Sequence, residues 1–238
     1  PTKLTKQIEE ITNYRIRKQN LDDEFGTSAV YYEIDEFGTH IELWRFTTTN
    51  QIINASIGDI NGDGRIDFAM GAKGKPFENG NYFAVYYSQK DITKPWRKAL
   101  LPGAGEQFGA THAAPADVNG DGKIDILATR GHGVGVMWFE APNWNQHMID
   151  DTIDSTHSTD FGDIDGDGDI DMSTVGYESR LAVWYENDGR GNFSRHVLSR
   201  DQMAYDTMIT DLDGDGHMDI LVAGQRSQNV VWFENPQK

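Results

Sequence analysis

Short apolar segments alternate with turns rich in glycine and aspartate along most of the chain. One set of segments directly follows the aspartate-rich turns and spans 66–72, 124–129, 170–175 and 218–223. A second set, rich in β-branched and aromatic residues, spans 82–87, 135–139, 181–185 and 229–233. Residues of this kind favour strands, and short segments between turn formers are typical of antiparallel sheets. The pattern predicts an all-β fold.

A further set of apolar segments completes the repeating unit. It spans 96–101, 146–149 and 193–198, and it has no counterpart in the last unit. The unit recurs roughly every 50 residues, a period typical of repeated supersecondary structure. Together with the segment before each aspartate-rich turn, a unit has four short antiparallel strands, which describes a β-propeller blade. We expect one β-propeller domain over residues 1–238, with blades at about 50–101, 110–150, 156–199 and 204–235.

An incomplete unit precedes these four blades. Residues 29–33 read Ala-Val-Tyr-Tyr-Glu and resemble residues 84–88, while His40 to Thr47 can form the outer strand of the same unit. The unit has no aspartate-rich turn. We therefore expect five four-stranded blades with a degenerate first blade, and the alternatives are four blades or an open propeller fragment.

Residues 1–27 form an N-terminal segment in front of the first unit. Leu4, Ile8 and Ile11 recur at helical spacing and indicate a short amphipathic helix. Residues 14–18 are a candidate strand for closing the ring, because the last unit stops at its third strand.

The aspartate-rich turns share one nine-residue pattern, with Asp at positions 1, 5 and 9, Asp or Asn at position 3, and Gly at positions 4 and 6. Asp-Gly and Asn-Gly pairs are ordinary turn formers, but four copies of one pattern favour a bound ion. Calcium takes six to eight oxygen ligands, and side chains at alternate positions of a tight loop converge on one point. Position 7 adds its backbone carbonyl. We expect up to four Ca²⁺ ions, one in each loop. The expected ligands are Asp59, Asn61, Asp63, Arg65 and Asp67; Asp117, Asn119, Asp121, Lys123 and Asp125; Asp163, Asp165, Asp167, Asp169 and Asp171; and Asp211, Asp213, Asp215, His217 and Asp219.

These loops differ from EF-hands. An EF-hand needs an acidic residue at position 12 and a helix on each side. Position 12 is Met70, Ala128, Thr174 or Val222 here, and the flanking residues favour strands. The loops therefore belong between strands.

Two of the repeats carry a family resemblance. Residues 57–64, Ile-Gly-Asp-Ile-Asn-Gly-Asp-Gly, and 161–168, Phe-Gly-Asp-Ile-Asp-Gly-Asp-Gly, resemble FG-GAP or VCBS repeats. Such repeats form calcium-binding propeller blades in integrin α-subunits, propeller lectins, some polysaccharide lyases and the aldos-2-ulose dehydratase group. The resemblance covers about residues 50–235. It implies a propeller with calcium between the first and second strand of each blade, and it does not imply one activity.

The charge of the chain limits its partners. The net charge of −17 comes largely from the aspartate-rich loops, and such a chain repels the phosphates of nucleic acid. No apolar stretch approaches the roughly 20 residues that cross a bilayer, so we expect no membrane insertion. Calcium sites of moderate affinity stay empty at cytosolic calcium levels. We therefore expect a secreted or cell-surface protein, although residues 1–27 show no signal-peptide pattern.

Polar and aromatic residues collect at the strand ends opposite the loops, which is the second candidate site. Imidazoles there can bind a metal or transfer a proton, although a histidine at a strand start is more often a hydrogen-bonded filler. The candidate ligand-binding residues are His112, His157, His132, Arg130, Tyr177, Tyr205, Asp206 and Arg226.

Three functions fit these features. The first is an extracellular, lectin-like module that binds glycans or a protein partner. The second is a sugar lyase or dehydratase that uses the histidine cluster. The third is a structural segment of a larger adhesin or assembly, with self-association through exposed blade edges. No Ser-His-Asp order, phosphate loop or dinucleotide fingerprint is present in the sequence, so no catalytic residue is assigned.

Overall fold

The computed structural model describes residues 17–19, 27–34, 40–48, 52–73, 80–92 and 94–235. These residues form five antiparallel sheets in chain order, and no helix lies among them. The first sheet contains β1 (Arg17–Gln19), β2 (Thr27–Ile34) and β3 (His40–Thr48). The second contains β4 (Ile52–Gly58), β5 (Asp67–Ala72), β6 (Tyr82–Tyr87) and β7 (Arg97–Leu100).

Two four-stranded sheets and one three-stranded sheet follow the second sheet. The third sheet contains β8 (Ala110–Ala116), β9 (Asp125–Arg130), β10 (Val134–Glu140) and β11 (Asn145–Asp154). The fourth contains β12 (Thr156–Gly162), β13 (Asp171–Gly176), β14 (Leu181–Asn187) and β15 (Phe193–Ser199). The fifth contains β16 (Asp206–Thr210), β17 (Asp219–Gly224) and β18 (Asn229–Phe233). The third and fourth sheets each have four strands, and the fifth has three.

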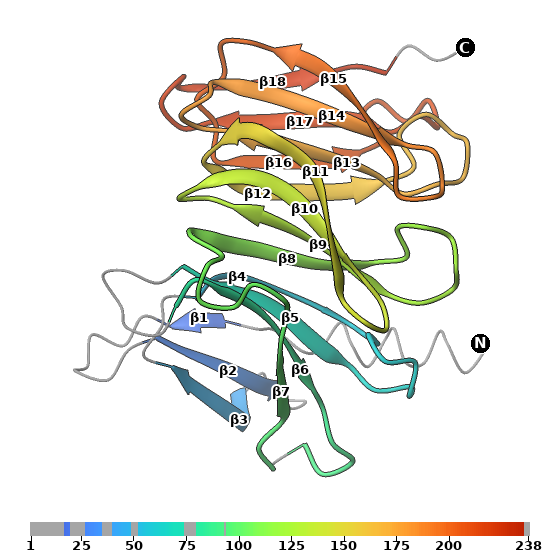
Figure 1. Ribbon diagram of the computed structural model, residues 1–238. Coiled ribbons are helices and arrows are strands. Elements are labelled where there is room, and N and C mark those ends of the chain that lie inside the picture. Colours follow the sequence, from blue (N-terminus) through green and yellow to red (C-terminus); the bar gives the residue numbers. More distant parts are fainter. Residues whose placement is uncertain are drawn as a thin grey trace.

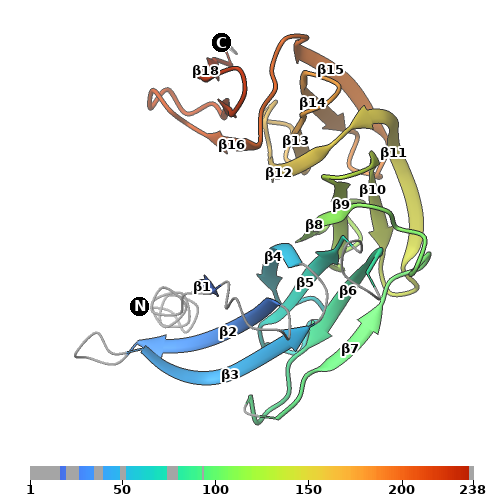
Figure 2. The ribbon, with the colours of Figure 1, turned by 90° about the vertical axis from the view of Figure 1, so that its left-hand side faces the viewer.

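The sheets are arranged as propeller blades. Within each sheet, strands that are consecutive in the chain pair as neighbours, and the sheets follow one another in the order of the chain (Figure 1). Figure 2 shows that they lie along an open arc. The predicted all-β propeller fold is confirmed, with five sheets and a first sheet that lacks an aspartate-rich loop. No pairing among the described strands closes the ring, which agrees with the alternative of an open propeller fragment.

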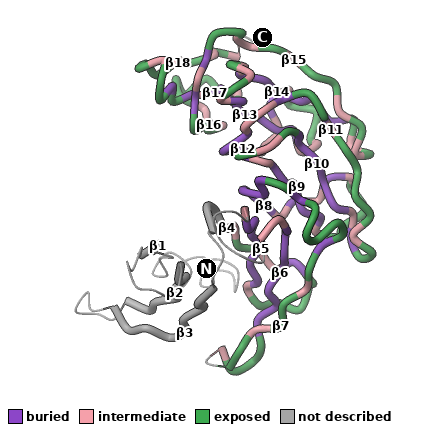
Figure 3. Tube along the Cα trace, turned by 60° about the vertical axis from the view of Figure 1, so that its left-hand side comes forward, coloured by how far each residue is buried: buried purple, intermediate pink, exposed green. Residues whose placement is uncertain are grey.

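Apolar side chains pack between neighbouring sheets and hold the arc together. Phe83 of β6 contacts Phe139 of β10 with ring centroids 5.7 Å apart. Trp138 of β10 belongs to the next apolar cluster, together with Tyr185 of β14. Burial of each such ring contributes about 2 kcal/mol. Figure 3 shows buried residues along the inner strands and exposed residues along β7, β11 and β15, because only the inner strands have protein on both faces.

Part of the N-terminal segment is described. Arg17–Gln19 pairs antiparallel with β2, with Arg17 opposite Val30, and so belongs to the first sheet. The helix expected from Leu4, Ile8 and Ile11 lies outside the described residues. Ring closure by residues 14–18 remains a prediction. No helix among the described residues is long and apolar enough to cross a membrane.

Candidate functional site

The four aspartate-rich loops each join the first and second strand of a sheet. In the third sheet, the backbone N–H of Gly122 donates to Asp117 Oδ2 at 2.9 Å, and that of Asp121 donates to Asp117 Oδ1 at 3.1 Å. The N–H of Asp121 also reaches Asn119 Oδ1 at 3.1 Å. Gly120 and Gly122 have φ angles of 70° and 81°, which residues with a side chain resist. The glycines therefore let the loop turn around the carboxylate at position 1.

Carboxylates converge in two of the loops. Ligand oxygens of Asp163, Asp165 and Asp167 lie within 4.8 Å of one another, and so do those of Asp211, Asp213 and Asp215. Negative charges this close repel one another unless a cation lies between them. Both groups consist of oxygen donors alone, which suits a hard divalent cation. These two loops can therefore hold a metal ion.

The first two loops are less acidic. Asn61 and Asn119 replace the acid at position 3, so each loop offers an amide oxygen there. The residue at position 7 adds a positive charge, because Arg65 pairs with Asp63 and Lys123 pairs with Asp121. In all four loops the backbone N–H at position 7 donates to the acid at position 5, at 2.9 to 3.0 Å. The last two loops have Asp169 and His217 at position 7 instead of a paired Arg or Lys. The four loops thus differ in the charge that they offer a cation.

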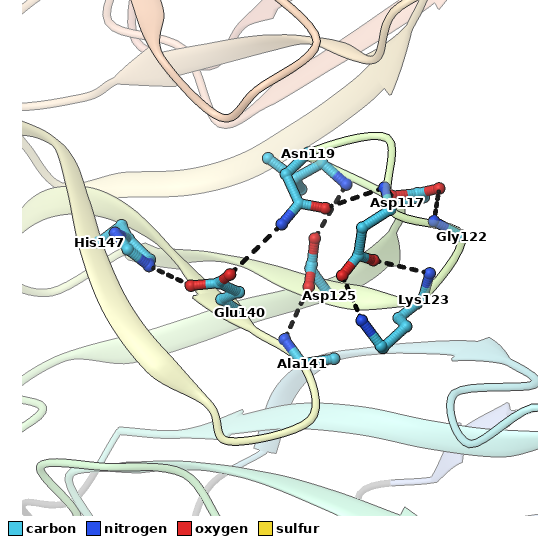
Figure 4. A network of polar contacts seen from close by, with 10 residues as sticks. Asp117, Asn119, Gly122, Lys123, Asp125, Glu140, Ala141 and His147 are labelled. Atoms are coloured by element: carbon cyan, nitrogen blue, oxygen red, sulfur yellow. Dashed lines mark hydrogen bonds and ion pairs between the residues drawn. The ribbon is translucent and has the colours of Figure 1, made fainter.

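The aspartate at position 9 ties each loop to its sheet. Asp125 is fully buried and accepts two backbone hydrogen bonds, from Val118 at 3.0 Å and from Ala141 at 2.7 Å (Figure 4). Asp171 does the same with Ile164 and Asn187, both at 2.9 Å. Burial raises the pKa of both carboxyls to about 6, although these hydrogen bonds oppose the shift. Asp67 accepts an equivalent backbone hydrogen bond from Ser88. Asp219 accepts two, from Leu212 and from Asn235.

A cleft of about 270 Å³ lies between the loops of the second and third sheets. Asp59 and Asn61 line one side, and Lys123 and Trp144 line the other, with Tyr87 also in the wall. The cleft places polar side chains of two loops beside one indole.

A second cluster lies at the other ends of the strands. His157 is the second residue of β12, and Tyr205 precedes β16, whereas the aspartate-rich loops follow these strands. His132 and Tyr177 follow β9 and β13, which the aspartate-rich loops precede. A strand of six or seven residues is about 20 Å long. The two candidate sites therefore lie on opposite faces of the arc.

The side chains of this second site form an aromatic cluster. We use the name aromatic cluster for His132, His157, Tyr177 and Tyr205. The His157 and Tyr205 rings stack with centroids 4.0 Å apart and an interplanar angle of 17°. His132 meets His157 edge-on at 4.7 Å, and Tyr177 meets Tyr205 edge-on at 5.1 Å. Tyr205 is 38% exposed, so the cluster presents an aromatic surface to solvent.

The histidines of the aromatic cluster are neutral near pH 7. Burial, followed by the charges of His132 and Lys73, lowers the pKa of His157 to about 4. Burial and Lys73 also lower the pKa of His132, whose Nε2 lies 3.3 Å from Lys73 Nζ. Burial is the main cause of a raised pKa at Tyr205. One cation, Lys73, therefore borders an uncharged aromatic surface.

His112 makes no ring contact with the aromatic cluster and instead forms hydrogen bonds to neighbouring sheets. Its Nδ1 accepts the backbone N–H of Thr159 at 3.3 Å, and its Nε2 pairs with Ser56 Oγ at 3.0 Å. Because both nitrogens are engaged, neither is free to bind a metal. Burial lowers the pKa of His112 to about 4, despite the opposing charge of Asp206. The geometry is that of a hydrogen-bonded filler between three sheets.

The remaining candidate residues take separate positions. Arg130 points toward Gln107 Oε1, at 2.5 Å, and Val134 O, at 3.1 Å, rather than toward the aromatic rings. Asp206 accepts a hydrogen bond from Ser158 Oγ at 2.6 Å and so joins the fourth and fifth sheets beside Tyr205. Arg226 is exposed in the turn between β17 and β18. The structure thus brings four of the eight candidates into ring contact.

Sequence reasoning missed a repeated contact between the third and fourth strands. Trp138 stacks on His147 and Trp184 stacks on His196, with centroids 4.4 Å apart in both cases. Each histidine also pairs through Nε2 with a glutamate two residues after the tryptophan: His147 with Glu140 at 2.9 Å, and His196 with Glu186 at 2.7 Å. The repeated order Trp-aromatic-Glu was the available signal.

The comparisons agree with this architecture. The family model of the FG-GAP-like repeat matches residues 117–173 and 163–222. No curated protein matches the sequence. Among solved structures, a protein described as a 6-phosphogluconolactonase from Bacteroides fragilis aligns at 15% identity with a TM-score of 0.57, over 88% of this chain and 61% of its own.

A second solved structure gives the same result. The periplasmic gluconolactonase PpgL from Pseudomonas aeruginosa aligns at 14% identity with a TM-score of 0.58, over 94% of this chain and 62% of its own. The chain thus spans about three fifths of the length of both structures. At this identity the likeness shows the fold alone. The third to fifth sheets of this chain carry FG-GAP-like repeats, and these repeats form blades of a β-propeller-type fold.

Proposed function

We propose that the chain is a calcium-stabilised, extracellular β-propeller module that binds glycans or a protein partner through the aromatic cluster. The observation that carries the proposal is the stacked pair of His157 and Tyr205, bordered edge-on by His132 and Tyr177. Exposed aromatic rings bind the apolar faces of sugars and act as anchors in protein interfaces. Lys73 beside the cluster supplies a hydrogen-bond donor for a hydroxyl or a carboxylate.

Calcium has a structural role in this proposal. Up to four ions would occupy the aspartate-rich loops, on the face away from the aromatic cluster, with carboxylate and amide oxygens as ligands. A bound cation would offset the repulsion within the groups Asp163-Asp165-Asp167 and Asp211-Asp213-Asp215. Extracellular calcium suffices for sites of moderate affinity, whereas cytosolic calcium does not. This difference supports a secreted or cell-surface location.

The enzyme alternative has less support. A histidine-bound metal would need free imidazole nitrogens, but both nitrogens of His112 are engaged by Thr159 and Ser56. The guanidinium of Arg130, one of the candidate ligand-binding residues, is turned toward Gln107 and Val134. The described residues therefore favour binding over catalysis at this face.

A glycan array tests the proposed binding site directly. The full chain, in millimolar calcium, is applied alongside the variant Tyr205→Ala. We expect saturable binding to a defined set of glycans, lost in the variant, with an unchanged melting temperature because Tyr205 is partly exposed. The matched control is Phe108→Ala, which removes an aromatic ring that is 63% exposed and makes none of the cluster contacts. This control should keep full binding.

Two results would count against glycan binding. Silence across a broad array would remove the glycan as ligand, and would leave the protein partner as the form of the proposal to test by the same variants. Binding that survives Tyr205→Ala but is lost in Phe108→Ala would place the site elsewhere.

A further inference from the structure

One residue near the end of the third strand of a sheet holds the position-9 aspartate of that sheet's loop. Its backbone N–H donates to the aspartate Oδ1 at 2.7 to 2.9 Å in the second to fifth sheets. The residues at this place are Ser88, Ala141, Asn187 and Asn235. The backbone bond is therefore common to these sheets, whereas the side chain differs.

In the fourth sheet this side chain reaches the loop of the preceding sheet. Asn187 Nδ2 donates to Val118 O at 2.7 Å and to Ile170 O at 3.0 Å. Val118 is position 2 of the loop in the third sheet, between the expected ligands Asp117 and Asn119. Ile170 is position 8 of the loop in the fourth sheet. One side chain thus ties two aspartate-rich loops together.

The amide of Asn187 is held in one orientation. Its Oδ1 accepts the backbone N–H of Gly191 at 3.1 Å, while its Nδ2 donates to the two carbonyls. Turning the amide over would place an oxygen against both carbonyl oxygens, none of which can donate. The side chain is 1% exposed, so water cannot replace these bonds. A shift of one loop is therefore transmitted to the other.

The fifth sheet repeats the contact. Asn235 Nδ2 donates to Ile164 O at 2.7 Å and to Met218 O at 3.3 Å. Ile164 is position 2 of the loop in the fourth sheet, and Met218 is position 8 of the loop in the fifth. The same atom thus bridges the same two loop positions in two successive pairs of sheets.

The second and third sheets lack this bridge. Ala141 occupies the place and has no side-chain donor, although its backbone N–H keeps the bond to Asp125. Ile60, which is position 2 of the loop in the second sheet, and Ala141 instead line the cleft of about 270 Å³. The described residues therefore contain two pairs of loops joined by an asparagine and one pair without it.

We infer that Asn187 and Asn235 are positioning residues that couple calcium binding in the loops of the third, fourth and fifth sheets. The inference rests on the calcium role proposed above. A bound ion orders its loop, because the ligands at positions 1, 3 and 5 must converge on it. In the third sheet this order fixes the Val118 carbonyl, and Asn187 extends it to Ile170 and Asp171 of the next loop. The second ion then orders less of its loop on binding, which makes the coupling positive.

Calorimetry on loop variants measures the coupling. Calcium is titrated into full chains in which chosen loops are inactivated by replacing the aspartate at position 5. The overall constant for two ions, with the third- and fourth-sheet loops active, is compared with the product of the constants from chains that keep one of these loops. We expect the overall constant to exceed the product about tenfold. The substitutions are Asp63→Asn, Asp121→Asn, Asp167→Asn and Asp215→Asn.

The loops of the second and third sheets are the internal control. The same comparison for this pair should give a ratio close to one, because Ala141 cannot bridge them. Calcium affinity and charge are treated alike in both pairs, so a difference between the ratios reports the bridge.

A substitution of the bridge assigns the coupling to Asn187. Leucine is similar in size to asparagine but cannot donate, so Asn187→Leu should bring the tenfold ratio toward one. A residue that only stabilised the fold would lower the melting temperature and leave this ratio unchanged. The matched control is Asn192→Ala, because Asn192 is exposed and its amide bonds Asp188 of the same turn rather than another loop. This control should keep the ratio.

Hydrogen exchange tests the coupling without changing Asn187. In calcium, Asp167→Asn should speed the exchange of amides in residues 117–123 of the neighbouring loop. Amides in residues 59–65 should exchange as in the native chain, because no asparagine bridges their loop to the next.

The results separate this inference from the calcium role on which it rests. Calcium binding with a ratio near one for the third- and fourth-sheet loops would overturn the inference alone. So would an equal ratio for the second- and third-sheet loops, or a tenfold ratio that survives Asn187→Leu. If no loop binds calcium, the inference and the proposed calcium role are both wrong.

Discussion

His157 and Tyr205 stack at 4.0 Å although they belong to neighbouring sheets, one at the start of β12 and the other just before β16. The contact joins the fourth and fifth sheets at the face opposite the aspartate-rich loops. It therefore couples the geometry of the proposed binding surface to the packing of two blades. The affinity of a ligand for this surface would therefore depend on the relative position of the fourth and fifth sheets.

The stack depends on a glycine beneath His157. A Cβ atom at Gly131 would lie 2.7 Å from His157 Nδ1 and 2.7 Å from Thr111 Oγ1, too close for either. We predict that Gly131→Ala displaces the His157 ring and lowers the free energy of unfolding by about 1 to 3 kcal/mol. In proton NMR, the ring-current shift that Tyr205 imposes on the His157 imidazole should be lost.

The control for this change is Gly162→Ala. The added methyl would meet Ile209 Cγ2 at 3.4 Å, an ordinary contact, at the other end of β12. This variant should keep the imidazole shift. An unaltered shift in Gly131→Ala would contradict the described stack.

Acid should destabilise the protein through His112. Its pKa is lowered from 6.5 to about 4 in the folded state, so the unfolded chain binds the proton first as the pH falls. The stabilising contribution of neutral His112 is present above pH 6.5 and is lost between pH 6.5 and 4. At pH 5 the loss is on the order of 2 kcal/mol.

Urea unfolding at pH 7 and pH 5 isolates this contribution when the native chain is compared with His112→Gln. Glutamine does not titrate, so the variant should lose less stability over this interval than the native chain does. The aspartates titrate in both proteins and cancel in the comparison. Equal losses would show that His112 is protonated at its ordinary pKa in the folded protein.

The aspartate at position 9 of each loop should stabilise the folded protein whether or not a metal ion is bound. Asp171 accepts the N–H groups of Ile164 and Asn187 through separate oxygens. In Asp171→Asn one of these donors would face an amide NH₂, so we predict a loss of about 1 to 3 kcal/mol that persists in EGTA. Thermal or urea unfolding with and without chelator measures this.

Asp165→Asn provides the contrast within the same loop. It recreates the asparagine that Asn61 and Asn119 already provide in the first two loops. In EGTA this variant should be as stable as the native chain or more stable, because it removes one charge from a repelling group. If Asp171→Asn is also harmless in EGTA, position 9 is not a structural clamp.

Much of the fold was visible in the sequence because the repeat marks each strand. The pattern placed β6 at 82–87 and β18 at 229–233, where the structure has them. Each loop pattern also predicted the strand that follows it, because the aspartate at position 9 is the first residue of that strand. Ring closure was less accessible, because it depends on packing between residues far apart in the chain rather than on a local pattern.

The candidate site was only partly predictable for a similar reason. Strand ends placed His157, His132, Tyr177 and Tyr205 on one face, and these four do meet. Sequence position gave no direction for side chains, so Arg130 was included although it turns toward Gln107. The pairing of His147 and His196 with tryptophans needed the register between strands, which no single repeat reveals.

The most direct test of the account is the melting temperature of the full chain in millimolar calcium and in excess EGTA. Calcium at about 100 times the dissociation constant adds about 2.7 kcal/mol per site, which raises the melting temperature by roughly 5 °C or more for a protein of this size. We predict a large, saturable and reversible increase, reduced by Asp167→Asn. An identical melting temperature in calcium and in EGTA would contradict the claim that calcium in the aspartate-rich loops stabilises this propeller.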